Sequence, residues 1–382
     1  MSSDVVADVR GRAVIAAMGV TEQGELPGRT ANQIAVEAFR LALEDAQIGK
    51  DEVDGLITCK SFGGDGVDTD IGKMAGLRPA YSATLDYGTC NFSLHLATMA
   101  IATGMAECVA IMYGTNQRSA GNRFSVSPIE PDITEPYGFF NVATVAAMAF
   151  RRHQHLYGTR EDQLGMIAVA QREWAQLNPT AIFQQPMTID DYMAKPYLVR
   201  PLRRPDMTMI SDGGACLIVT TPERASDMPN TPVYVLGMAQ QAALREYQHD
   251  DHFMRSYIGD VANRVYRSAG IEQTDVDALY IQDPFSPWVL QMLEWYGFCP
   301  MGEVGGFLED GHTRPGGSLP VNTNGGQLSE AYMWGWLHLV EAVRQLRGEA
   351  GPRQVEGARF AQHASTFSTR KAASTILGAE LP

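Results

Sequence analysis

The chain has 382 residues, of which 45% are hydrophobic, 9% aromatic and 19% charged. This length fits one large domain or two domains of ordinary size, with ample hydrophobic core in either case. The formal net charge of −14 repels nucleic acid and anionic membranes, so neither is expected as the main partner. The composition therefore indicates a soluble acidic protein.

The chain start and the cysteines indicate a cytoplasmic protein. The first residues are polar and acidic, unlike a signal peptide, and no apolar run approaches the roughly 18 residues that would span a membrane. The five cysteines are widely spaced, with no C-x-x-C pair. This spacing is typical of reduced thiols rather than a disulfide framework, and no metal site is expected.

An internal repeat organises the chain. Residues 46–57 (Ala-Gln-Ile, then Asp-Glu-Val-Asp-Gly-Leu-Ile) match residues 269–280 (Ala-Gly-Ile, then Thr-Asp-Val-Asp-Ala-Leu-Tyr). In both copies a helix with apolar periodicity leads through an Asp-rich turn into a short apolar strand. The chain therefore divides into two similar halves, residues 1–228 and 229–382.

The elements that follow each repeat come in a similar order. In the first half we expect a helix at about 92–103 and a strand at 108–113, and in the second a helix at about 330–347 and a strand near 358–361. Alternating helices and apolar strands predict parallel βαβ units in an α/β sheet covered on both faces.

The first half carries a long insertion, residues 116–209, that is rich in Arg, Gln, Met and aromatic residues. It contains an amphipathic helix expected at residues 160–177. Long insertions near strand ends usually build substrate walls or subunit contacts.

Three ordered motifs carry a family resemblance. Residues 322–335 read Asn-Thr-Asn-Gly-Gly-Gln-Leu-Ser-Glu-Ala-Tyr-Met-Trp-Gly, residues 211–219 read Ser-Asp-Gly-Gly-Ala-Cys-Leu-Ile-Val, and residues 282–286 read Gln-Asp-Pro-Phe-Ser. Together they resemble the signature segments of the thiolase superfamily. The resemblance implies the thiolase fold, two βαβαβαββ halves in a five-layered αβαβα arrangement.

The catalytic groups of a thiolase are largely replaced. A thiolase uses a nucleophilic cysteine, a histidine and a second cysteine. Here Tyr332 stands at the histidine position, residues 364–366 (Ala-Ser-Thr) stand near the second cysteine position, and Tyr87 falls at the nucleophile position unless a small gap restores Cys90. Claisen condensation through an acyl-enzyme is therefore disfavoured.

The chain also resembles the thiolase-like aldolases of bacterial steroid side-chain degradation. That resemblance implies retro-aldol cleavage of a β-hydroxyacyl-CoA into a ketone and propionyl-CoA or acetyl-CoA, with two tyrosines matching Tyr332 and Tyr247 and with Asp283 assisting them. A phenol can donate and accept one proton, which suits this role if its environment lowers its pKa from about 10. The predicted substrate-binding residues are Asn324, Gly325, Gly326, Tyr87, Cys90, His363 and Ser365.

The resemblance further implies a homodimer and a separate OB-fold, zinc-ribbon subunit that helps to bind acyl-CoA. CoA enters as part of the substrate, and no other cofactor is expected. Two alternatives stay open: a thiolase or acyltransferase that uses Cys90, and a non-catalytic lipid carrier on the same fold.

Overall fold

The computed structural model describes residues 9–61, 63–86, 90–121, 142–242, 255–367 and 371–382. The first half contributes five strands, in the spatial order β3-β2-β4-β7-β1. Strand β2 is parallel to β3 and β4, whereas β7 is antiparallel to β4 and β1. The strands are β1 (Val14–Val20), β2 (Gly55–Cys59), β3 (Tyr81–Leu85), β4 (Cys108–Thr115) and β7 (Gly213–Thr220).

The second half contributes four strands in the order β8-β11-β10-β9, and β8 pairs with β1, so that these nine strands form one sheet. A tenth strand position is occupied by Val321, which forms an isolated parallel bridge with Leu279. The strands are β8 (Val233–Ala242), β9 (Ala278–Ile281), β10 (Phe360–Phe367) and β11 (Lys371–Gly378).

The sheet is mixed rather than wholly parallel. Strands β9 and β10 are parallel, as are β2, β3 and β4, but β11 is antiparallel to β10 and β8. Only three residues separate β10 from β11, too few for the crossover that a parallel pair needs. The predicted parallel βαβ units therefore account for part of each half.

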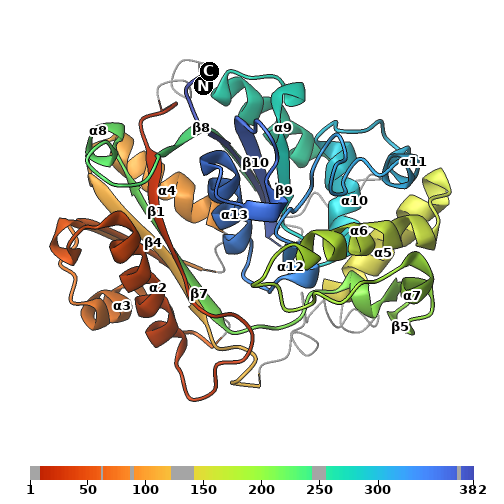
Figure 1. The fold of residues 1–382 in the computed structure, drawn as a ribbon, viewed down its shortest axis with the longest axis horizontal. Coiled ribbons are helices and arrows are strands. Elements are labelled where there is room, and N and C mark those ends of the chain that lie inside the picture. The colour runs from red at the N-terminus through yellow and green to blue at the C-terminus, as the bar shows by residue number, and fades with distance from the viewer. Residues whose placement is uncertain (1–8, 62, 87–89, 122–141, 243–254, 368–370) are drawn as a thin grey trace.

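The helices form the layers of the predicted thiolase fold (Figure 1). Helices α2 (Ala31–Ala46) and α3 (Asp68–Ala75) cover one face of the first half, and α9 (Arg255–Ala269) covers the outer face of the second. Helices α4 (Cys90–Ala102) and α13 (Trp336–Arg347) lie between the two halves and contact strands of both. The five-layered αβαβα arrangement is confirmed.

The two copies of the repeat use one aspartate in the same way. The Asp54 carboxylate accepts hydrogen bonds from the N–H groups of Glu107 and Cys108 at 2.8–3.0 Å, where β4 begins. The Asp277 carboxylate accepts from the N–H groups of Arg359 and Phe360 at 2.7 and 2.9 Å, where β10 begins. Short 3₁₀ turns, η1 (Lys50–Glu52) and η6 (Gln273–Asp275), precede both aspartates. The predicted duplication is therefore visible at the level of single side chains.

The insertion packs against the second half, although it belongs to the first in sequence (Figure 1). Its elements are α5 (Val142–Tyr157), α6 (Glu161–Gln176), α7 (Ile189–Met193), β5 (Tyr197–Val199), β6 (Leu202–Arg203) and η4 (Arg204–Asp206). Helices α5 and α6 lie against α10 (Ser286–Trp295), and α6 also contacts α11 (Val304–Glu309). A buried hydrogen bond of 2.9 Å between His153 and Glu294 joins α5 to α10.

The remaining described elements are α8 (Pro222–Ala225), which lies just before β8, α12 (Gly326–Ser329) and η7 (Gly351–Arg353). The proposed division at residues 228 and 229 falls between α8 and β8. Among the described helices, none combines the length and apolarity needed to cross a bilayer.

The helix expected from residue 330 begins later, at Trp336. Trp334 and Gly335 have left-handed φ angles of 52° and 86°, which are incompatible with a continuous right-handed helix. Residues 330–335 therefore form an irregular loop between α12 and α13, and this loop presents Tyr332.

Candidate active site

The loop that carries Tyr332 starts beside β9, where Asn322 fixes it. The Asn322 Oδ1 accepts a hydrogen bond from Ile281 N at 2.8 Å, and its Nδ2 donates to Ile281 O at 2.9 Å. The side chain thus supplies both hydrogen bonds that a neighbouring strand would give to Ile281. This places the loop at the carboxyl end of β9, the edge where α/β sheets commonly bind ligands.

Asp283 is fully buried and holds the short helix α12. Its Oδ1 accepts a hydrogen bond from Gln327 N at 2.9 Å, and its Oδ2 accepts from Leu328 N at 3.2 Å. N–H groups in the first turn of a helix have no partner within the helix, so a carboxylate is a favourable cap. In this structure Asp283 orients the loop that leads to Tyr332.

His338 of α13 connects Asp283 to the loop. Its Nε2 faces two acceptors, Asp283 Oδ1 at 2.8 Å and Ile281 O at 2.9 Å, and therefore carries a hydrogen. Its Nδ1 lies 3.3 Å from Asn324 Nδ2, which can only donate, so Nδ1 is an acceptor. The network thus makes Nε2 the donor and Nδ1 the acceptor of His338.

The glycine pair of the loop is needed for packing. Gly325 and Gly326 have φ angles of 99° and 63°. A Cβ on Gly325 would lie 2.7 Å from the Cβ of Ala175 in α6, and one on Gly326 would lie 2.4 Å from Asp283 Oδ2. The close backbone approach predicted at this pair is thus made by protein atoms, and contact with a substrate stays a prediction.

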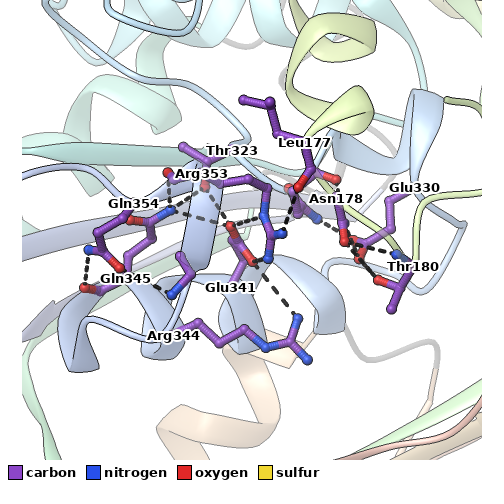
Figure 2. Close-up of polar contacts among 12 residues, drawn as sticks. Leu177, Asn178, Thr180, Thr323, Glu330, Glu341, Arg344, Gln345, Arg353 and Gln354 are labelled. Carbon is purple, nitrogen blue, oxygen red and sulfur yellow. Dashed lines mark hydrogen bonds and ion pairs between the residues drawn. The ribbon is translucent and has the colours of Figure 1, made fainter. Parts of the chain in front are cut away.

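The insertion is hydrogen-bonded to the same loop. The N–H groups of residues 182–183 donate to the carbonyls of residues 329–330 at 2.9–3.1 Å. The Asn178 amide donates to Asn324 O at 2.8 Å and to Glu330 Oε1 at 2.9 Å (Figure 2). The predicted role of the insertion as a wall of the site is consistent with these contacts.

Glu330 is a buried carboxyl group two residues before Tyr332. Asn324 Nδ2 donates to its Oε2 at 2.5 Å, in addition to the bond from Asn178. Burial and the nearby negative charge of Glu341 raise the pKa of Glu330 to about 7. Both protonation states of Glu330 are therefore populated at neutral pH.

A buried ion pair lies behind this carboxyl group (Figure 2). Arg353 binds the Glu341 carboxylate through two hydrogen bonds of 2.9 Å each. Thr323 Oγ1 also donates to Glu341 at 3.0 Å. Because two-point arginine–carboxylate pairs restrict both partners, this contact fixes the start of the loop relative to α13.

Tyr332 itself is only 4% exposed. Its N–H donates to Ser211 Oγ at 3.3 Å, and its ring centre lies 5.4 Å from that of Trp334. Burial, with a smaller contribution from the phenol of Tyr113, raises the pKa of Tyr332 well above its usual range. The expected lowering of this pKa is therefore wrong, because burial disfavours the phenolate. The phenol is protonated at neutral pH and can act as a hydrogen-bond or proton donor.

Cys90, His363 and Ser365 come together although they are far apart in sequence. Cys90 Sγ lies 3.7 Å from His363 Nδ1, and Asn91 Nδ2 donates to Ser365 Oγ at 2.8 Å. Burial, and to a lesser extent the Cys59 thiol, raises the pKa of Cys90 well above 9. A helix N-terminus favours thiolates, but here the cost of burial is larger and the thiol stays protonated.

The described site residues form two groups: one in and around the Tyr332 loop, and one made of Cys90, His363 and Ser365. Gly335, in the loop, lies beside the second group. A Cβ on Gly335 would lie 3.0 Å from His363 and 3.2 Å from Cys90 Sγ. The described predicted residues are Tyr332, Asp283, Asn324, Gly325, Gly326, Cys90, His363 and Ser365. Tyr247 and Tyr87 lie outside the described residues.

Sequence reasoning missed several polar residues of this region: Glu330, His338, Gln327, Tyr113 and Ser211. Glu330 and Gln327 lie within the signature segment, so their polarity at buried loop positions was an available signal. Ser211 begins the second motif, residues 211–219, whereas His338 carried no spacing signal. Tyr113, in contrast, read as an ordinary strand residue.

The C-terminal half matches a known family. Residues 239–379 match the family described as thiolase C-terminal domain-like. The chain is 36% identical to the steroid side-chain-cleaving aldolase of Thermomonospora curvata over 88% of this chain and 91% of that protein. It is 33% identical to the 17-hydroxy-3-oxo-4-pregnene-20-carboxyl-CoA lyase of Mycobacterium tuberculosis over 88% and 92% of the two chains.

Two further similarities extend along the chain. It is 31% identical to an acetyl-CoA acetyltransferase of Methanothermobacter thermautotrophicus over 91% of this chain and 94% of that one. The solved structure of the Ltp2-ChsH2(DUF35) aldolase superposes with a TM-score of 0.89 and 33% identity, covering 97% of this chain and 98% of that one. The chain belongs to the thiolase superfamily, among the thiolase-like proteins that include the steroid side-chain-cleaving aldolase.

Proposed function

We propose that this chain is a retro-aldolase that cleaves a steroid side-chain β-hydroxyacyl-CoA into a ketone and a short acyl-CoA, such as propionyl-CoA or acetyl-CoA. The observation that carries the proposal is the buried, protonated phenol of Tyr332 in the signature loop. Relatives at 33–36% identity with lyase and aldolase names support the same reaction.

The reaction needs an acid, a base and stabilisation of an enolate. A base removes the proton of the β-hydroxyl group, and the electrons of that O–H bond form the ketone carbonyl. The bond between the α and β carbons breaks, and its electrons spread onto the thioester oxygen as an enolate. An acid then protonates the α carbon, so no covalent bond to the protein forms.

Tyr332 suits the role of acid because its phenol keeps its proton at neutral pH. Tyr247, which lies outside the described residues, is proposed as the second tyrosine and the base. Asp283 supports Tyr332 through the loop, since its carboxylate caps α12 and accepts from His338. CoA is bound as part of the substrate, and we propose no separate cofactor.

A second candidate is an acyltransferase that uses Cys90. It is favoured by the 31% identical acetyl-CoA acetyltransferase and by the 3.7 Å contact of Cys90 Sγ with His363 Nδ1. It is opposed by the full burial of Cys90 and its raised thiol pKa, because the thiolate is the nucleophile. We therefore rank it below the aldolase.

The two candidates are separated by comparing Tyr332→Phe with Cys90→Ala on a panel of β-hydroxyacyl-CoA thioesters. The aldolase predicts a ketone and a short acyl-CoA, loss of activity in Tyr332→Phe, and no adduct in the protein mass. The acyltransferase predicts an acyl-enzyme and inactivation by iodoacetamide. Binding without turnover by the active assembly would instead identify a lipid carrier.

We also propose a cytoplasmic homodimer that works with an OB-fold, zinc-ribbon subunit for acyl-CoA binding. The similarity to the Ltp2-ChsH2(DUF35) aldolase, whose name pairs two proteins, supports a partner subunit. Sedimentation of the chain alone and with a co-expressed candidate subunit tests both parts. A monomer under all conditions would contradict the homodimer.

A further inference from the structure

His363 has a buried nitrogen for which no contact among the described residues accounts. The residue lies on β10 and is 0% exposed, and its Nε2 has no hydrogen-bond partner among the described residues. An unpaired buried polar group destabilises the folded state. Native proteins therefore retain such groups rarely, and catalytic use is one of the established reasons.

The free nitrogen faces the loop of Tyr332. A Cβ on Gly335 would lie 3.0 Å from His363 Nε2, and Gly335 follows Tyr332 by three residues. The left-handed φ of 86° at Gly335 gives the chain a second reason to have glycine there. Nε2 of His363 thus lies beside the segment that presents the proposed acid.

Cys90 determines which nitrogen of His363 carries the hydrogen. Burial, with nearby His338 and His95, lowers the pKa of His363 well below 6.5, so the ring is neutral and has one N–H group. The Cys90 thiol keeps its proton and lies 3.7 Å from Nδ1. If the S–H is the donor in this contact, Nδ1 is the acceptor and the ring hydrogen lies on Nε2.

Gln327 offers a second free donor at the same place. Its Oε1 accepts a hydrogen bond from Gly335 N at 3.0 Å, which fixes the orientation of the amide. Its Nε2 is buried and has no partner among the described residues. The Gln327 amide and the His363 ring therefore both lie beside Gly335. N–H donors held in place by the protein are the groups with which enzymes stabilise a developing oxyanion.

We propose that His363 is a further catalytic residue, whose Nε2–H, held in that tautomer by the Cys90 thiol, hydrogen-bonds to the thioester oxygen as enolate charge develops. Gln327 Nε2 is the second donor to the same oxygen. Cys90 does not attack the substrate and is a positioning residue.

This inference rests on the proposed function, and enolate formation can be measured without the steroid. The probe is propionyl-CoA in D₂O, whose α-hydrogens exchange only through the enolate. The full chain is used, with its partner subunit if the active assembly contains one. Exchange is followed by mass spectrometry of the acyl-CoA.

Wild-type protein is expected to catalyse the exchange. His363→Leu should slow it by about 100-fold, the usual loss for one oxyanion donor. His363→Gln, whose Nε2 places an N–H near the same point, should stay within about tenfold of wild type. Cys90→Ser, which keeps a donor toward Nδ1, should exceed Cys90→Ala. Cys299→Ala, which removes a buried thiol in the core of the second half, is the control and should leave exchange unchanged.

The outcomes separate the two ideas. If the wild type neither exchanges the α-hydrogens nor releases a ketone from any β-hydroxyacyl-CoA of the panel, the retro-aldolase proposal fails and this inference fails with it. If it releases the ketone without exchange, the same variants are compared by their rates of ketone release. If the wild type exchanges the α-hydrogens and folded His363→Leu matches its rate, only the role of His363 is refuted. If folded Cys90→Ala matches the rate of Cys90→Ser, the role of Cys90 is refuted.

A direct readout of the tautomer does not depend on the stability of any variant. In protein labelled with ¹⁵N-histidine, His363 of the wild type should show a protonated Nε2 and an unprotonated Nδ1. Cys90→Ala should shift the ring toward a mixture of tautomers. A wild-type spectrum with the hydrogen on Nδ1 would overturn the proposal.

Discussion

Replacing Tyr332 by Phe removes one oxygen atom and leaves the ring. Tyr332 is 4% exposed, and its ring centre lies 5.4 Å from that of Trp334. Phenylalanine keeps both this burial and this ring contact. Loss of one buried hydroxyl hydrogen bond costs about 1 kcal/mol of folding stability. The variant should therefore fold, with a midpoint of urea unfolding close to that of the wild type.

The effect on catalysis should be much larger. A positioned acid contributes a factor of roughly 10²–10⁴ to the rate, which corresponds to about 3–5 kcal/mol of transition-state stabilisation. Product formation under single-turnover conditions, measured as ketone released from a β-hydroxyacyl-CoA, should fall by that factor. Substrate affinity should change little, because the acid acts mainly in the transition state.

The pH profile adds an independent check. An acid must be protonated, and the pKa of Tyr332 is raised well above 10. Its protonated fraction is therefore constant across pH 6–9, and Tyr332 should cause no decline in rate as pH rises. Folded Tyr332→Phe with at least a tenth of wild-type activity would refute the assignment of Tyr332 as acid.

Three further predictions concern stability. The pKa of Glu330 is raised from 4.5 to about 7. Protonated Glu330 therefore contributes to the free energy of unfolding fully below pH 4.5, and this contribution, of order 3 kcal/mol, is lost as pH rises through 7. Glu330→Gln should remove this decline from unfolding free energies measured across pH 4–8. Glu341→Gln leaves the buried Arg353 charge uncompensated and should lower the unfolding free energy by about 3–5 kcal/mol in urea titrations, whereas little change would mean that the pair is solvated. Gly325→Ala places a Cβ 2.7 Å from Ala175 at a φ of 99° and should lower the free energy of unfolding by at least about 1–3 kcal/mol. Gly316→Ala is the control, because its Cβ meets no neighbour although its φ is also positive. Equal losses of stability in both variants would assign the effect to backbone strain alone.

The sequence could predict what local patterns encode. The duplicated Asp-rich turns predicted two similar halves, and Asp54 and Asp277 hold β4 and β10 by the same two hydrogen bonds. The signature motif located Tyr332. Both conclusions depend on residues close together in the chain.

The misses have physical causes. The helix expected from residue 330 begins at Trp336 because Trp334 takes a left-handed φ that propensity does not foresee. The contact between Cys90 and His363 joins residues 273 positions apart, and only the packing of α4 against β10 creates it. The raised pKa of Glu330 likewise follows from its burial and from its proximity to Glu341, and the sequence shows neither.

The hydrogen bonds between the insertion and the Tyr332 loop have a consequence for recombination between homologues. The amide of Asn178 and the backbone of residues 182–183 belong to a segment that is distant in sequence from residues 329–330, yet they complete the hydrogen bonding of that loop. A chimaera whose insertion came from a homologue with an apolar residue at position 178 would leave the Asn324 carbonyl and the Glu330 carboxyl without this donor. The backbone hydrogen bonds of residues 182–183 would survive such an exchange, so the side chain at position 178 decides whether the two segments can be recombined.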